Sequence, residues 1–174
     1  MQRQVSSDGE TCLCLKPIRM LQISIISIGK TNESYVREGL DKYIKLLGKY
    51  CKVDWKELSD VKNGNKMEAD RLKDAEAELL ALHLPDKAFV CFLDETGKQF
   101  DSPAFATYLQ RKSTDYSRIA FVIGGSYGLS ETIKKRGEAL SLSGMTFNHQ
   151  MVRIILCEQL FRAFTIIKGT GYHH

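Results

Sequence analysis

A glycine-rich segment, IGGSYG (residues 123–128), ends a short run of apolar residues in the C-terminal half of the chain. Gly124 and Gly125 let the backbone approach another group closely, and Gly128 follows three residues later. The spacing differs from the dinucleotide fingerprint G-x-G-x-x-G, and no phosphate loop of the form G-x-x-x-x-G-K-[ST] is present. The segment therefore predicts either a simple tight turn or a turn whose bare backbone lies against a flat ligand.

Two arginines, Arg153 and Arg162, interrupt the apolar stretch MVRIILCEQLFRAFTIIK together with Glu158. One interpretation is a charge cluster that keeps a helix soluble, and the other is a pair of cations directed at an anionic partner.

The chain ends in GTGYHH, so Tyr172, His173 and His174 follow two glycines. A phenol and an imidazole offer stacking, hydrogen bonding and general base chemistry near neutral pH. A tail of this composition is equally typical of a disordered end.

The composition is that of an ordinary globular protein, with 174 residues, 43% hydrophobic and 26% charged. The net charge of +4 permits an anionic partner without requiring one. No apolar run approaches the roughly 18 residues that a membrane helix needs. Five cysteines include no C-x-x-C pair, which indicates a reducing compartment and neither a disulfide framework nor a zinc site.

Apolar periodicity predicts alternating strands and helices after a polar segment without periodicity. That segment, residues 1–19, is predicted to be a flexible extension, and residues 20–174 a single domain. Strands are predicted at 21–28, 53–58, 88–93 and 119–123, with a turn at 94–98. Helices are predicted at 33–47, 67–83, 102–112, 130–140 and 148–168, three of them capped by Ser102, Ser130 and Asn148, and a short fifth strand falls within 140–147.

This alternation is typical of an α/β domain with a mostly parallel sheet covered by helices on both faces. Ligands of open parallel sheets bind beyond the carboxyl ends of the strands, where the segments LDETGK and IGGSYG both lie. The helix near the C-terminus is apolar on almost every side, so we expect one face to pack on the sheet and another on a second subunit.

The segments FVIGGSYGLSE, LSLSGMTFNHQMVRIILCEQLFRAFTIIKG and YHH together resemble the RlmH (YbeA) family. This family consists of small methyltransferases of the SPOUT superfamily that act on 23S ribosomal RNA. The opening strand ISIISIGK and the turn LDETGK match as well, and the resemblance covers residues 20–174. It implies a deep trefoil knot near the C-terminus, a homodimer built on the knotted region, S-adenosylmethionine as cofactor, no metal, no membrane, and a cytoplasmic location.

The resemblance also implies the residues of the site. Tyr172 and His173, reaching across from the partner subunit, would meet the target base, and Arg153, Arg162 and His174 would hold the RNA. The cofactor residues would be Leu93, Gly124, Gly125, Gly128, Leu142, Ser143, Gly144, Met145, Thr146 and Phe147.

The implied reaction is methylation of N3 of a pseudouridine in 23S rRNA, on the assembled ribosome. N3–H is weakly acidic, so alignment and assisted deprotonation are the main tasks of such an enzyme. Three alternatives stay open: a methyltransferase for another RNA such as tRNA; a non-enzymatic dimeric ribosome-associated protein, favoured only by Gly144 where the family has a bulkier residue; and a flavodoxin-like nucleotide binder.

Overall fold

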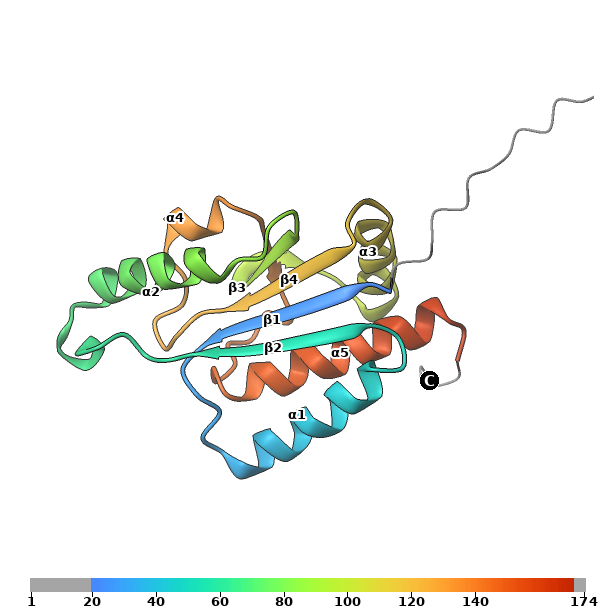
Figure 1. Cartoon of the computed structure of the whole chain (residues 1–174), viewed down its shortest axis with the longest axis horizontal. Coiled ribbons are helices and arrows are strands. Elements are labelled where there is room, and N and C mark those ends of the chain that lie inside the picture. Colours follow the sequence, from blue (N-terminus) through green and yellow to red (C-terminus); the bar gives the residue numbers. More distant parts are fainter. Residues whose placement is uncertain (1–19, 171–174) are drawn as a thin grey trace, which may run out of the picture.

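A computed structural model describes residues 20–170, which form a five-stranded sheet with helices on both faces (Figure 1). The strands are β1 (Gln22–Ile28), β2 (Lys52–Leu58), β3 (Phe89–Gln99), β4 (Arg118–Ile123) and β5 (Glu138–Ser141). The helices are α1 (Ser34–Leu47), α2 (Ala69–His83), α3 (Ser102–Asp115), α4 (Glu131–Lys134) and α5 (Met151–Ile167), with a 3-10 turn, η1, at Gly64–Lys66. The predictions made for residues 1–19 lie outside this range.

The sheet has the order β2-β1-β4-β3-β5, and every strand pair is parallel. The central strands β1 and β4 are buried along almost their whole length, which explains why both are continuous apolar runs. Strand β2 lies at an edge and alternates between exposed and half-buried residues. The predicted α/β fold with a mostly parallel sheet and helices on both faces is therefore confirmed.

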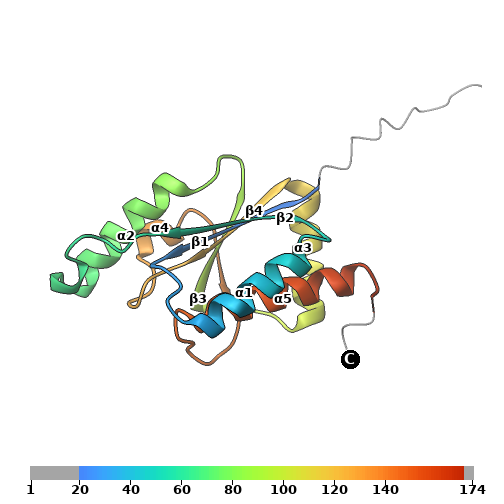
Figure 2. The same ribbon diagram turned by 60° about the horizontal axis from the view of Figure 1, so that its bottom comes forward.

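Helices α1, α3 and α5 cover one face of the sheet, and α2 and α4 cover the other (Figures 1 and 2). The first face carries the larger core, in which Ile25 and Phe121 of the strands meet Leu40 and Leu160 of the helices. The second core is smaller and joins Ile26 and Val122 to α2 and α4. Alternate residues of each central strand thus enter opposite cores.

Helix α5 lies between α1 and α3 and packs against both, as well as against the sheet. Its buried residues occupy more than one side of the helix, which accounts for the apolar character seen in the sequence. Ile154, Ile155, Ile166 and Ile167 stay only half-buried. The described chain therefore covers most of this helix but leaves part of its apolar surface open.

Strand β3 and the segment after β4 differ from the sequence-based predictions. β3 continues through residues 94–98, which were predicted as a turn, because β5 pairs with both ends of this segment across an irregularity between Leu93 and Lys98. A Cβ at Gly97 would lie 2.5 Å from the backbone nitrogen of Leu140, so glycine permits this pairing. The helix predicted at 130–140 ends at Lys134, and β5 begins at Glu138.

Helix caps account for two further differences. The carboxylate of Asp101, not the hydroxyl of Ser102, caps α3 by accepting from the backbone N–H of Ala104 at 2.7 Å. Asn148 accepts from the N–H of Gln150 at 2.7 Å, but α5 itself begins three residues after it, at Met151. The cap predicted at Ser130 is confirmed, since its hydroxyl accepts from the N–H of Thr132.

Truncation of Leu160 tests how much α5 contributes to the fold. Leu160 is 0% exposed, so we expect Leu160→Ala to lower the free energy of unfolding by about 3 kcal/mol through lost burial and a residual cavity. The matched control is Leu82→Ala in α2, where the side chain is 82% exposed and the change should stay within about 0.5 kcal/mol. Urea unfolding followed by circular dichroism measures both, and equal losses would contradict the described packing of α5.

Candidate functional site

A pocket of about 610 Å³ opens where β4 and β5 end, beside the middle of β3. Leu93, Ile123 and Leu140 form its apolar floor, one residue from each strand. The walls come from residues 94–96 of β3 and from the loops that follow β4 and β5, and the carboxyl ends of strands are the usual position of a ligand site in a parallel sheet.

The pocket brings together all the predicted cofactor residues except Gly144. Those that line it are Leu93, Gly124, Gly125, Gly128, Leu142, Ser143, Met145, Thr146 and Phe147. Gly144 lies in the same loop, where an added Cβ would meet only the amide nitrogen of Gln99, at 4.0 Å. Nothing in this geometry requires a glycine at position 144.

The loop after β4 is a tight turn in which the N–H of Gly128 donates to the carbonyl of Gly125 at 3.1 Å. Gly128 has a φ of +80°, a conformation that favours glycine. A Cβ at Gly124 would stand 3.0 Å from the carbonyl carbon and oxygen of Gly128. The loop therefore presents backbone to the pocket and has no room for a side chain at position 124.

Glu76 of α2 holds this loop from the other side. Its side chain is buried, and its carboxylate accepts from the backbone N–H of Gly125. Burial raises the pKa of Glu76, and the nearby charge of Asp60 acts in the same direction, while the bond from Gly125 opposes them. A Cβ at Gly125 would overlap the carboxylate, whose second oxygen would be 2.8 Å away.

Three charged side chains in the pocket lining, Asp94, Glu131 and Lys134, are paired with one another. The ammonium group of Lys134 contacts Asp94 at 2.9 Å and also pairs with Glu131, and these two bonds raise the pKa of Lys134. Thr146 donates to Glu95 at 2.6 Å, which joins the loop after β5 to the extended part of β3.

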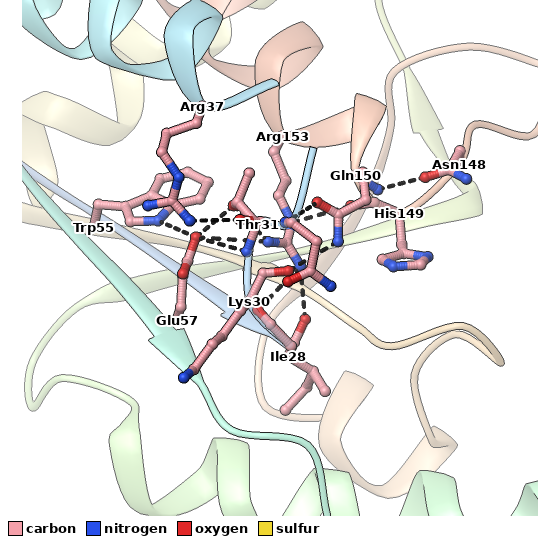
Figure 3. Close-up of polar contacts among 12 residues, drawn as sticks. Ile28, Lys30, Thr31, Arg37, Trp55, Glu57, Asn148, His149, Gln150 and Arg153 are labelled. Atoms are coloured by element: carbon pink, nitrogen blue, oxygen red, sulfur yellow. Dashed lines mark hydrogen bonds and ion pairs between the residues drawn. The ribbon is translucent and has the colours of Figure 1, made fainter. Parts of the chain in front are cut away.

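A buried arginine anchors the segment just before α5, which lines one side of the pocket (Figure 3). The guanidinium of Arg153 is 0% exposed and donates to the carbonyl oxygens of Ile28, Gly29 and His149 at 2.8, 3.1 and 3.1 Å, and to the Thr31 hydroxyl at 2.7 Å. Its Nη1 also lies 3.7 Å from a carboxylate oxygen of Glu57.

Gln150 reinforces the same junction (Figure 3). Its side-chain amide donates to the carbonyl of Lys30 at 2.9 Å and accepts from the N–H of Asn32 at 3.2 Å. We call Arg153, Gln150, Thr31 and Glu57 the Arg153 cluster. It ties the loop after β1 to the start of α5, and the pocket residues Phe147, Asn148 and His149 come directly before that point.

The structure places the three sets of predicted functional residues differently. The burial of Arg153 leaves no part of its side chain for contact with an RNA, so the alternative interpretation, a structural charge, fits this residue. Arg162 pairs with Glu158 at 2.5 Å and remains about a quarter exposed. Tyr172, His173 and His174 lie outside the described residues.

Within residues 20–170, no helix is both long and apolar enough to span a membrane. In the same range, no group of three or more His, Cys, Asp and Glu side chains is arranged to hold a metal ion. Cys51, Cys91 and Cys157 are buried free thiols, and burial raises the pKa of each to about 12.

Comparison with known proteins assigns this arrangement to a family. Residues 21–173 match the family described as "Predicted SPOUT methyltransferase". The chain belongs to this family. A protein of Geotalea daltonii named "Ribosomal RNA large subunit methyltransferase H" is 42% identical over 156 residues, which are 88% of this chain and 100% of that protein. Proteins with the same name from Christiangramia forsetii and Clostridium botulinum are 41% and 44% identical, and each match covers 88% of this chain and 99% of the other protein.

The SPOUT family implies S-adenosylmethionine, and the pocket has the chemistry to accept this molecule. Its volume of about 610 Å³ lies within the usual range for small-molecule sites. Gly124 presents backbone without a side chain, and Leu93 and Leu142 supply apolar walls for an adenine ring. The exposed carboxylate of Glu95 can face the cationic end of the molecule.

Two buried or half-buried acids of this SPOUT methyltransferase, Glu76 and Glu57, were not predicted from the sequence. A signal for Glu76 was present, because Leu72, Glu76 and Leu80 are spaced four apart and share the apolar stripe of α2. Glu57 carries no such signal, because an acid in a strand at the edge of a sheet is ordinary, and its partner Arg153 lies far away in the sequence.

Gly125→Ala tests the contact between α2 and the glycine loop. We expect the new methyl group to displace the loop and weaken cofactor binding by at least about tenfold, whereas Gly144→Ala, the control, meets no neighbour and should change little. The double variant Glu76→Ala/Gly125→Ala removes the obstructing carboxylate and should recover much of the loss. Calorimetric titration with S-adenosylmethionine measures all three, and equal effects of the two glycine substitutions would rule out the contact.

The pH dependence of stability tests the Arg153 cluster. Burial alone would raise the pKa of Glu57, but hydrogen bonds from Thr31 and Trp55 and the charge of Arg153 outweigh it and lower the pKa below the ordinary 4.5. A carboxylate with a depressed pKa in the folded state stabilises the protein above pH 4.5, and this contribution disappears as the pH falls through the folded-state value. The free energy of unfolding should thus decline less between pH 6 and pH 3 in Glu57→Gln than in the unmodified protein, as measured by urea titration. Glu38→Gln, on the exposed side of α1, is the control, and parallel acid profiles for Glu57→Gln and the unmodified protein would contradict the described pairing.

Proposed function

We propose that this SPOUT methyltransferase uses S-adenosylmethionine to methylate N3 of a pseudouridine in 23S ribosomal RNA on the assembled ribosome. The names of the relatives support ribosomal RNA as the substrate class. The observation that carries the proposal is the pocket at the ends of β4 and β5, beside β3, which gathers all but one of the cofactor residues implied by the family around a backbone-lined turn.

Cofactor binding is assigned to the three loops around this pocket. The backbone at Gly124 would lie against the adenine, and the loop of residues 142–147 would enclose the rest of the molecule. When bound, S-adenosylmethionine supplies a strongly electrophilic methyl group. The chain then has to bind the nucleotide, exclude water and align N3 with that methyl group.

Proton removal is assigned to the C-terminal tail. N3–H of the base lies between two carbonyl groups and is weakly acidic, so His173 takes its proton as general base or orients the group that does, while Tyr172 stacks on or positions the ring. The tail is contributed by the partner subunit, and Arg162 and His174 contact the RNA. No metal is required for this reaction.

A homodimer and a trefoil knot complete the proposal. Open apolar surface on α5, together with the exposed side chains of Met145, Phe147 and Met151 nearby in the sequence, supports a second copy packed against this region. The knot would be formed by the segment after Leu93, by the loop after β4 and by residues 140–147, each of which contributes residues to the pocket lining. The location is cytoplasmic, where ribosomes are found.

Cofactor binding and methyl transfer test the proposal in that order. Calorimetry should show S-adenosylmethionine bound by the unmodified protein and more than about tenfold weaker binding by Gly124→Val, whose side chain meets the Gly128 carbonyl. The bound protein should then transfer a labelled methyl group to ribosomes and not to bulk tRNA.

Each negative result removes a different part of the proposal. Absence of binding by the unmodified protein would overturn the enzymatic function. Equal labelling of bulk tRNA would overturn the assignment of ribosomal RNA as the substrate. If a variant truncated after Gly171 keeps full activity, the tail takes no part in proton removal.

A further inference from the structure

A second pocket, of about 480 Å³, lies beside the first one. It is bounded by the loop after β1, by the turn after β4 and by the segment around η1, and Leu72 and Glu76 of α2 contribute to its lining. Strands β1 and β4 are neighbours in the sheet, but the chain leaves them in opposite directions, toward β2 and toward β5. A crevice at such a switch point is a usual ligand position in open parallel sheets.

The turn after β4 separates the two pockets, since Gly125, Ser126, Tyr127 and His149 line both of them. A group in the second pocket therefore has no straight path to a methyl group held in the first, so its occupant is not the base that reacts. It lies one turn of backbone away from that base. This separation suits the adjoining nucleotide of a single strand, because proteins that read RNA sequence splay neighbouring bases apart.

The floor of the second pocket carries a buried hydrogen-bond acceptor. Glu76 is 6% exposed, and within residues 20–170 the donor found for its carboxylate is the N–H of Gly125. A carboxylate offers about four acceptor sites, so a ligand can use those that Gly125 does not. Asp60 adds a second negative charge close enough to act on the pKa of Glu76, and the amides of Asn63 and Asn65 line the same pocket.

These floor groups restrict the chemistry of the occupant. The carboxylates of Glu76 and Asp60 would repel a phosphate. The amino group on the edge of adenine, cytosine or guanine donates to a carboxylate oxygen, whereas uracil places a carbonyl oxygen on each side of its N–H. The floor therefore favours a base that carries an amino group.

The rim offers stacking and positive charge. The ring of Tyr127 is 61% exposed on the turn between the pockets, and an exposed aromatic ring is a platform for an unstacked base. The side chain of Lys30 is exposed and points away from the Arg153 cluster (Figure 3). Lys62 and Lys66, on the segment around η1, are exposed as well. Lysines at the rim can hold the phosphates of a strand whose base lies in the pocket.

We propose that the second pocket binds the nucleotide adjoining the target in the RNA strand, with the amino edge of its base on Glu76 and Asn63 and its ring against Tyr127. The target base itself stays at the first pocket, where the partner's tail meets it, and the turn after β4 holds the two bases apart. The inference rests on the proposed function, because it concerns recognition of the substrate in the same reaction. It makes the enzyme selective for the sequence beside its target.

A double-mutant cycle between enzyme and ribosome tests this assignment. The substrates are ribosomes without the methyl group, either natural or with uridine in place of each nucleotide beside the target, one at a time. With the unmodified enzyme, one of the two replacements should lower kcat/KM about tenfold, because Glu76 loses the donor that it binds. Glu76→Gln should lower kcat/KM for natural ribosomes by about the same factor, and the same replacement should then cost less than about twofold.

Two further variants make the test independent of the support that Glu76 gives to the turn. Tyr127→Ala removes the ring, and Asn63→Gly removes the amide while it preserves the left-handed backbone at φ 59°. Each should raise the KM for natural ribosomes at least about fivefold, with the Kd for S-adenosylmethionine within about twofold of the unmodified value by calorimetry. Tyr127→Phe keeps the ring and should lose less than Tyr127→Ala.

Glu78→Gln is the matched control, because Glu78 stands two residues further along α2 and is exposed. If neither uridine replacement lowers kcat/KM, or if the loss is the same in Glu76→Gln, the inference is overturned while the proposed function stands. It is overturned as well if the loss in the pocket variants appears entirely in cofactor affinity. If the unmodified enzyme transfers no methyl group to natural ribosomes, the proposed function fails and this assignment fails with it.

Discussion

The burial of a single positive charge, on Arg153, organises the functional end of the molecule. Removing a guanidinium from water costs several kcal/mol unless hydrogen bonds and an opposite charge compensate it. Here the compensation comes from three places in the chain: the loop after β1, Glu57 of β2, and the turn before α5. All three must be in position together. The charge consequently links the sheet edge far from the cofactor pocket to the segment that forms the pocket wall.

A negative charge performs the corresponding task on the other face of the sheet. Glu76 projects from the apolar stripe of α2 and binds the backbone of the turn after β4. The turn consists mainly of glycines and small groups, so it has few side chains of its own with which to pack. One buried cation and one buried anion thus hold the two flexible walls that enclose the candidate site, and both bind chiefly to backbone atoms.

Local pattern was sufficient to predict most of the fold. The parallel sheet, four of the five strands and the long helices follow from apolar periodicity, because each element buries a face of its own. The continuation of β3 was missed because residues 94–98 have the composition of a turn, and only the pairing of Lys98 and Gln99 with β5 shows that the strand resumes. The helix predicted after Ser130 was too long because residues 138–141 form strand β5 and pair with β3. The positions of the glycines pointed to the candidate pocket, whereas the burial of Arg153 depends on partners more than 100 residues away that no local pattern reveals.

The order of strands in the sheet has a consequence for the synthesis of the chain. β1 pairs with β2 and with β4, which is made much later, and β5 must find β3 after β4 has already been placed beside it. Contacts between distant segments form slowly, because the closure of long loops costs entropy before the contacts stabilise anything. Arg153, which completes the junction with the first loop, is synthesised more than 100 residues after its partners in that loop. A nascent chain therefore cannot complete this pocket until the start of α5 has been synthesised, and the apolar strand β1 must stay protected in the meantime.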